Sequence, residues 1–126
     1  SQFHYLLENE LPKKFPNIRW AFIEAAASWL PYALQDLESR LSRKGKKLGD
    51  NPLKDNNIWI TLEMADDIPY LIDCVGDDNF LVGTDYGHTD TSAQIEALRM
   101  LGENPKISSS SIEKILGANP TKIYGF

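Results

Sequence analysis

The chain is poor in the features that would mark a secreted or membrane protein. Its single cysteine, Cys74, cannot form an intramolecular disulfide. Because Cys74 stands among apolar residues in the segment YLIDCVG, we expect a buried and unreactive thiol. No apolar run is long enough to cross a bilayer, and the first residues mix acids into apolar positions, unlike a secretory leader. We therefore expect a cytoplasmic protein with no membrane partner.

Several short motifs of enzymes and nucleic-acid-binding proteins are also missing. The sequence contains no His-x-His, HExxH or CxxC pair, no glycine-rich phosphate loop and no GxSxG. The net charge is −5, whereas a protein that binds phosphate backbones usually presents a positive surface. We therefore expect no nucleic-acid partner. The 126 residues, of which 42% are hydrophobic, suit one soluble domain with one core.

Three short apolar runs predict β-strands at residues 18–24, 58–63 and 80–85. None of them alternates strictly between apolar and polar residues, which is typical of parallel strands covered on both faces. Segments with helical periodicity lie between them. The clearest is the stripe of Trp29, Leu30, Ala33, Leu34, Leu37 and Leu41. This order of elements predicts an α/β fold with right-handed crossovers and a parallel sheet.

A carboxylate ends each of the three predicted strands: Glu24, Glu63 and Asp85. The carboxyl ends of parallel strands lie at one edge of a sheet, where the connecting loops build active sites. The three acids are therefore expected to converge. Converging carboxylates need a cation, protons or basic partners, and a divalent metal ion would meet that need. A strand-ending acid can equally cap the next helix, and for Glu63 we favour that local role or simple exposure.

The segment FLVGTDYGHTD is the richest candidate for a functional site. It places Asp85, Tyr86, His88 and Asp90 within a few residues. Carboxylate and imidazole groups suit zinc, iron or manganese. One short loop seldom provides all the ligands of a catalytic metal, however, so this segment alone does not predict a complete site.

These segments resemble part of a known family. The stretches FPNIRWAFIEAAASWLPYALQDLE, NIWITLE, FLVGTDYGHTD and ILGANPTKIYGF are similar to the last three βα units of the amidohydrolase-related metal-dependent hydrolases. That family consists of TIM barrels, and the branch includes aminocarboxymuconate-semialdehyde decarboxylase and aromatic-acid decarboxylases. The resemblance runs along nearly the whole chain, so residues 1–126 are expected to be a single partial domain.

The resemblance implies a role for five residues. Asp85 corresponds to the aspartate after the eighth strand, which in the family binds the metal or its water and handles a proton. Glu24 falls at the end of the sixth strand, where several relatives place a catalytic histidine, and this departure bears on the type of reaction. Trp29 and Tyr32 would border the substrate pocket, although Trp29 could equally belong to the core. His88 would face the substrate or support the site.

The family's main metal ligands are a His-x-His after the first strand and a histidine after the fifth, and this sequence does not contain them. The resemblance therefore implies the C-terminal three-eighths of a barrel, with zinc or manganese held largely by residues outside the chain. Three strands cannot close a barrel, and an inner face carrying some of Trp20, Phe22, Trp59 and Leu81 would lie open beside two unpaired edges. We expect an inactive isolated chain that forms a homodimer or associates with the missing N-terminal part.

Two classes of function remain at this point. In the first, the parent protein is a metal-dependent hydrolase or decarboxylase that acts on a small carboxylated or cyclic substrate. In the second, the chain is a self-contained, non-catalytic α/β module that binds a ligand or a partner.

Overall fold

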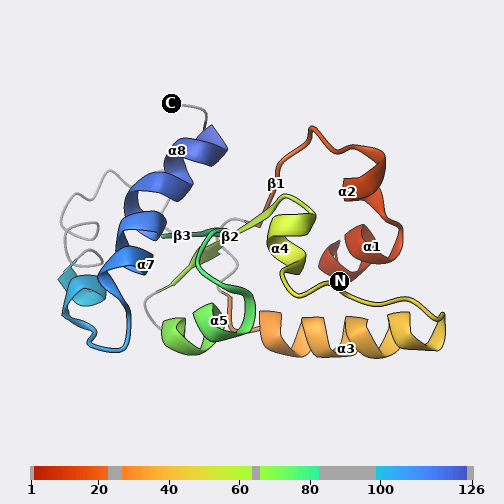
Figure 1. The fold of residues 1–126 in the computed structure, drawn as a ribbon, viewed down its shortest axis with the longest axis horizontal. Helices are drawn as coiled ribbons and strands as arrows, with labels where there is room; N and C mark the ends of the chain where they lie inside the picture. The colour runs from red at the N-terminus through yellow and green to blue at the C-terminus, as the bar shows by residue number, and fades with distance from the viewer. Residues whose placement is uncertain (1, 23–26, 64–65, 83–98, 125–126) are drawn as a thin grey trace.

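The structure is a computed structural model that describes residues 2–22, 27–63, 66–82 and 99–124. Helices alternate with strands along most of the chain (Figure 1). The elements are α1 (Gln2–Glu8), α2 (Leu11–Lys14), β1 (Trp20–Phe22), α3 (Leu30–Arg43), α4 (Pro52–Asp55), β2 (Ile58–Leu62), α5 (Ile68–Val75), β3 (Phe80–Val82), α7 (Ser109–Glu113), the π-helix η1 (Lys114–Ala118) and α8 (Asn119–Tyr124).

The three strands form one parallel sheet in the order β1-β2-β3, which confirms the predicted α/β class with parallel pairing. Trp20 pairs in register with Ile58, and Ile60 with Phe80. The first strand begins at Trp20 rather than at residue 18. Residues 23–24 and 83–85, where the first and third predicted strands end, lie outside the described residues.

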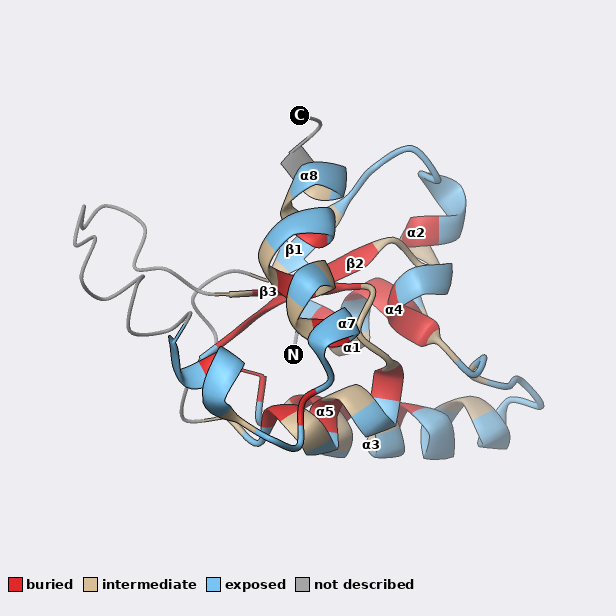
Figure 2. Ribbon diagram, turned by 60° about the vertical axis from the view of Figure 1, so that its left-hand side comes forward, coloured by how far each residue is buried: buried red, intermediate tan, exposed pale blue. Residues whose placement is uncertain are grey.

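Helices α3 and α5 lie on the same side of the sheet (Figure 1). The predicted apolar stripe of α3 is confirmed, because Leu30, Ala33 and Leu37 are buried in the same core as Ile58 and Ile60 of β2. Figure 2 shows the buried residues along the sheet and the inward sides of these helices, while the outward turns of α3 are exposed. No described helix is both long enough and apolar enough to span a membrane.

The two faces of the sheet differ in what they pack against. Side chains alternate across a strand, so Trp20, Phe22, Ile58 and Ile60 share the face that meets the helical core, and Ala21, Trp59, Thr61 and Leu81 share the other. The expectation that Trp59 and Leu81 lie open is wrong, since they are only 6% and 4% exposed. Trp20 and Phe22 are half-buried on the helical face. Ala21 is exposed.

The C-terminal helices are attached to the start of β3 by a polar cluster. The Asn119 side chain, which is fully buried, donates one hydrogen bond to the Asp77 carbonyl and another to the Phe80 carbonyl, both 2.8 Å long. The Asp77 carboxylate accepts hydrogen bonds from the Ser111 hydroxyl at 2.5 Å and from the Lys114 ammonium at 3.0 Å. Burial raises the pKa of Asp77, but these hydrogen bonds outweigh it and hold that pKa below its ordinary value.

The expectation of a buried Cys74 is wrong, because the thiol is exposed. Ile68, Leu71 and Val75 form the buried stripe of α5, and Cys74 lies beside that stripe on the outward surface. A hydrogen bond with Cys74 is the main cause that raises the pKa of Tyr70. Cys74 therefore contributes no packing to the core.

Candidate functional site

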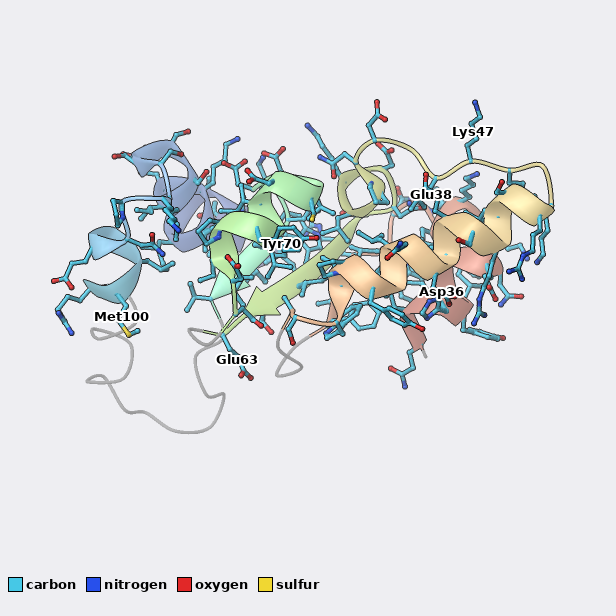
Figure 3. All side chains as sticks on the ribbon, turned by 90° about the horizontal axis from the view of Figure 1, so that it is seen from below. Asp36, Glu38, Lys47, Glu63, Tyr70 and Met100 are labelled. Carbon is cyan, nitrogen blue, oxygen red and sulfur yellow. The ribbon has the colours of Figure 1, made fainter. Side chains whose placement is uncertain are left out.

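The candidate site is the edge of the sheet at which the three parallel strands end. Glu63 directly follows β2, is exposed, and projects away from the sheet (Figure 3). This agrees with the exposure that sequence analysis allows for Glu63, whereas α5 is capped by Asp67. Glu24, Asp85 and His88 lie outside the described residues, so their convergence at this edge stays a prediction.

Asp66 joins the loops that follow β1 and β2. One oxygen of its carboxylate, Oδ2, accepts a hydrogen bond from the Ala27 backbone N–H at 3.0 Å and another from the Glu63 backbone N–H at 2.8 Å. Ala27 is fully buried and lies 39 residues before Asp66. Because both donors bond to one oxygen of this half-buried residue, the Asp66 carboxylate links the segment before α3 to the residue that follows β2.

Two further contacts order the same edge. The Thr61 hydroxyl of β2 donates a hydrogen bond to the Phe22 carbonyl at the end of β1, at 3.2 Å. Asp67 then caps α5 by accepting a hydrogen bond from the Tyr70 backbone N–H at 3.3 Å. The capping role that sequence analysis allows for strand-end acids thus falls to Asp67.

Trp29 packs in an aromatic cluster next to this edge. Its ring centroid lies 5.2 Å from that of Phe3 in α1 and 5.8 Å from that of Phe22 in β1, at tilted or edge-on angles. Such geometry is favourable between aromatic rings. The core role that sequence analysis left open for Trp29 is therefore observed, and a contact between Trp29 and substrate stays a prediction.

Tyr32, the other predicted pocket residue, lies in the first turn of α3 and is 74% exposed. Two hollows of about 490 and 430 Å³ open beside the loop that follows α3, and neither is lined by Tyr32 or Trp29. Neither of these two hollows therefore brings Tyr32 and Trp29 together.

Within the described part of the chain, no group of three His, Cys, Asp or Glu side chains is arranged to hold a metal ion. The nearest acids are poor candidates, because Asp66 already accepts two backbone hydrogen bonds on one oxygen and Glu63 points to solvent. The sequence offers Asp85 and His88 as candidate donors, and both lie outside the described residues. Their carboxylate and imidazole chemistry suits zinc or manganese.

The fold resembles that of a solved amidohydrolase, map2389c from Mycobacterium avium subsp. paratuberculosis K-10. The TM-score is 0.76 and the sequence identity 22%. The match covers 96% of this chain and 31% of that protein's chain, so the chain spans about a third of the length of the structure it matches. No protein-family model and no curated protein matches the sequence. At this level of identity the likeness establishes the fold.

Sequence reasoning missed Asp66 and the true partners of Asn119. The adjacent acids Asp66 and Asp67 precede α5, and the sequence predicts a helix cap there without showing which acid caps and which reaches across to the loop after β1. An asparagine directly before a proline is typical of a local helix cap, whereas the Asn119 side chain donates to the carbonyl groups of Asp77, just before β3, and of Phe80 in β3. In both cases the partner lies far along the chain.

Proposed function

We propose that this chain is the C-terminal part of an amidohydrolase-type, metal-dependent hydrolase or decarboxylase that acts on a small carboxylated or cyclic substrate. The observation that carries the proposal is the parallel three-stranded sheet, whose fold matches a solved amidohydrolase over 96% of the chain. The resemblance of the segments GTDYGH and NPTKIYGF to the same superfamily supports it independently of the fold.

In this proposal Asp85 and Glu24 are the catalytic residues, and Asp85 is also a metal ligand. Glu24 follows β1, whose end is held to β2 by the Thr61 hydroxyl, and Asp85 follows β3, which pairs with β2 in the same parallel sheet. A bound zinc or manganese ion would supply Lewis acidity for the reaction. The Asp85 carboxylate would then take or return a proton, while His88, Trp29 and Tyr32 would contact the substrate.

The remaining metal ligands would belong to a part of the fold that this chain does not span, and we expect the isolated chain to be inactive. We further propose that the chain associates with that part or with a second copy of itself. This partner is likewise a proposal.

The test is made on the native polypeptide that contains this sequence. We expect a bound divalent ion, measured by elemental mass spectrometry, to be lost in Asp85→Ala while the circular dichroism spectrum is unchanged. Asp73→Ala, which removes an exposed acid from α5, should keep the metal and serves as the matched control. A native protein without bound metal, or an Asp85→Ala variant that keeps the same metal content, would point instead to a non-catalytic binding module.

A further inference from the structure

The larger of the two hollows beside the loop that follows α3 has the size and lining of a ligand site. Its volume of about 490 Å³ falls in the range of about 300–1,000 Å³ in which proteins bind small organic molecules. We call it the outer hollow. It lies between α3, the loop of residues 48–50 and α5, and no described strand residue lines it. A ligand there would bind apart from the sheet edge that carries the proposed catalytic residues.

The more buried residues of this lining are apolar. Leu34 of α3 and Leu48 of the loop are half-buried and pack against the core, and Pro52, the first residue of α4, is buried. The core behind them holds these residues in place, so they form an apolar floor. An apolar group that covered the floor would remove its remaining exposed surface from water, which is favourable.

The charged residues of the lining are acids. Glu38 of α3 and Asp50 of the loop line the outer hollow, and neither forms an ion pair with a described residue. No lysine or arginine in the described ranges lines it. Asp36, on the opposite side of α3 from Glu38 (Figure 3), is by contrast paired with Arg40 at 3.0 Å. The outer hollow therefore carries negative charge that a bound cation would neutralise.

The neighbouring hollow of about 430 Å³ differs in its charges. It shares Leu48 with the outer hollow, but its acid Glu10 contacts Lys46 at 3.4 Å and Lys13 at 3.7 Å. These two lysines hold the pKa of Glu10 below its ordinary value. The basic residues of this region thus serve the neighbouring hollow, and the acids of the outer hollow are left without a basic partner among the described residues.

Tyr70 completes the lining on the side of α5. It is 54% exposed and makes a hydrogen bond with Cys74, one turn further along the helix. The face of an aromatic ring carries partial negative charge and attracts an organic cation. An aromatic ring, carboxylates and an apolar floor are together the groups that recognise an ammonium ion with an apolar substituent.

We propose that the outer hollow binds an organic ammonium ion that carries an apolar group. The ammonium would pair with the carboxylates of Glu38 and Asp50, and the apolar group would lie against Leu34 and Leu48 with the ring of Tyr70 beside it. Because these side chains belong to α3, the following loop and α5, the ligand would join three segments on the outer surface. The inference does not rest on the proposed function.

The test uses the native polypeptide that contains this sequence and takes Cys74 as a reporter, because its exposed thiol lines the outer hollow. The uncharged reagent iodoacetamide alkylates the thiol, and mass spectrometry of the peptide that contains Cys74 gives the rate. We expect phenethylammonium to slow this alkylation saturably. Phenethyl alcohol and phenylacetate carry the same apolar group without the positive charge. Each should protect Cys74 at least about tenfold less well, which corresponds to about 1.4 kcal/mol.

Variants then test the role of the two carboxylates. Glu38→Gln combined with Asp50→Asn nearly preserves the size of both side chains and removes their charge. The concentration of phenethylammonium that gives half-protection should rise about tenfold, again about 1.4 kcal/mol. Asp73→Asn removes an exposed acid of α5 outside the lining and is the matched control, which should behave like the native protein.

Absence of saturable protection would overturn the proposal. So would equal protection by phenethylammonium and phenethyl alcohol, because charge would then play no part. An equal loss of protection in Asp73→Asn and in the combined variant would also overturn it, because the overall charge of the protein would then be responsible. Circular dichroism establishes that the variants are folded, and Glu38→Gln alone keeps the test valid if the combined variant does not fold. The metal content of the native polypeptide tests the proposed function separately.

Discussion

Replacing Asp66 by alanine should loosen the edge that carries the proposed site. The change removes the acceptor shared by the backbone N–H groups of Ala27 and Glu63. Ala27 is fully buried, and an orphaned buried donor costs about 1–3 kcal/mol. The N–H of Glu63 lies at an exposed residue and can bond to water, so it adds only about 0.5 kcal/mol. We therefore expect a loss of about 1.5–3.5 kcal/mol in the free energy of unfolding.

Asp66→Asn separates the hydrogen bonds from the negative charge. Both bonds are made to one carboxylate oxygen, so the amide oxygen of asparagine can take its place and keep them. Only the contribution of the negative charge to these hydrogen bonds is lost. We therefore expect the free energy of unfolding to fall by less than about 1 kcal/mol. Glu63→Ala removes an exposed side chain without touching the backbone donor, and it should leave stability within about 0.5 kcal/mol of the native value.

The free energies of unfolding are compared by urea unfolding at 25 °C. The comparison requires that the free energy fall with urea concentration at the same slope in all variants. Amide hydrogen exchange should show faster exchange at Ala27 in Asp66→Ala but not in Asp66→Asn. The reasoning is refuted if Asp66→Ala unfolds like the native chain, or if the asparagine and alanine variants are equally unstable.

Three further predictions concern the rest of the fold. Asn119→Ala leaves two carbonyls beside β3 without their donor and should lower the free energy of unfolding by about 1–3 kcal/mol in urea; an unchanged midpoint would contradict the attachment described. The folded-state pKa of Asp77 lies below its ordinary value of 3.8, so its contribution to stability is present above that value and disappears as pH falls through the folded-state pKa. Asp77→Asn should therefore be less stable than the native chain at pH 7, and its unfolding midpoint should fall less as the pH is lowered. An equal fall of the midpoint in both proteins would contradict this. The exposed Cys74 should react with a thiol reagent in native buffer as completely as in denaturant, whereas protection in native buffer would contradict its exposure.

Local patterns predicted the framework of this fold. The apolar run at β2 corresponds to five consecutive buried residues, Ile58–Leu62, and the stripe of α3 is buried at Leu30, Ala33 and Leu37. The strand follows from an unbroken apolar run and the helix from its periodicity of three and four, and each segment carries its own signal. The exposure of Cys74 could have been found in the same way, because it lies off the stripe formed by Ile68, Leu71 and Val75.

Contacts between distant residues could not be predicted in this way. Asp66 and Ala27 are 39 residues apart, and so are Asn119 and Phe80. An acid before a helix or an asparagine before a proline first suggests a local cap, since such caps form whatever the rest of the chain does. Only the assembled sheet brings the strand ends close enough for one side chain to join them. The catalytic assignments of Asp85 and Glu24 rest on resemblance and on the common edge.

The central claim is that Asp85 belongs to a metal site, and anomalous X-ray diffraction from crystals of the native polypeptide tests it most directly. Data collected on either side of the zinc and manganese absorption edges would locate and identify the ion. The account predicts an anomalous peak about 2.0–2.2 Å from a carboxylate oxygen of Asp85, at the carboxyl ends of the strands. A native crystal with no such peak, or with a metal bound away from that edge, would contradict it.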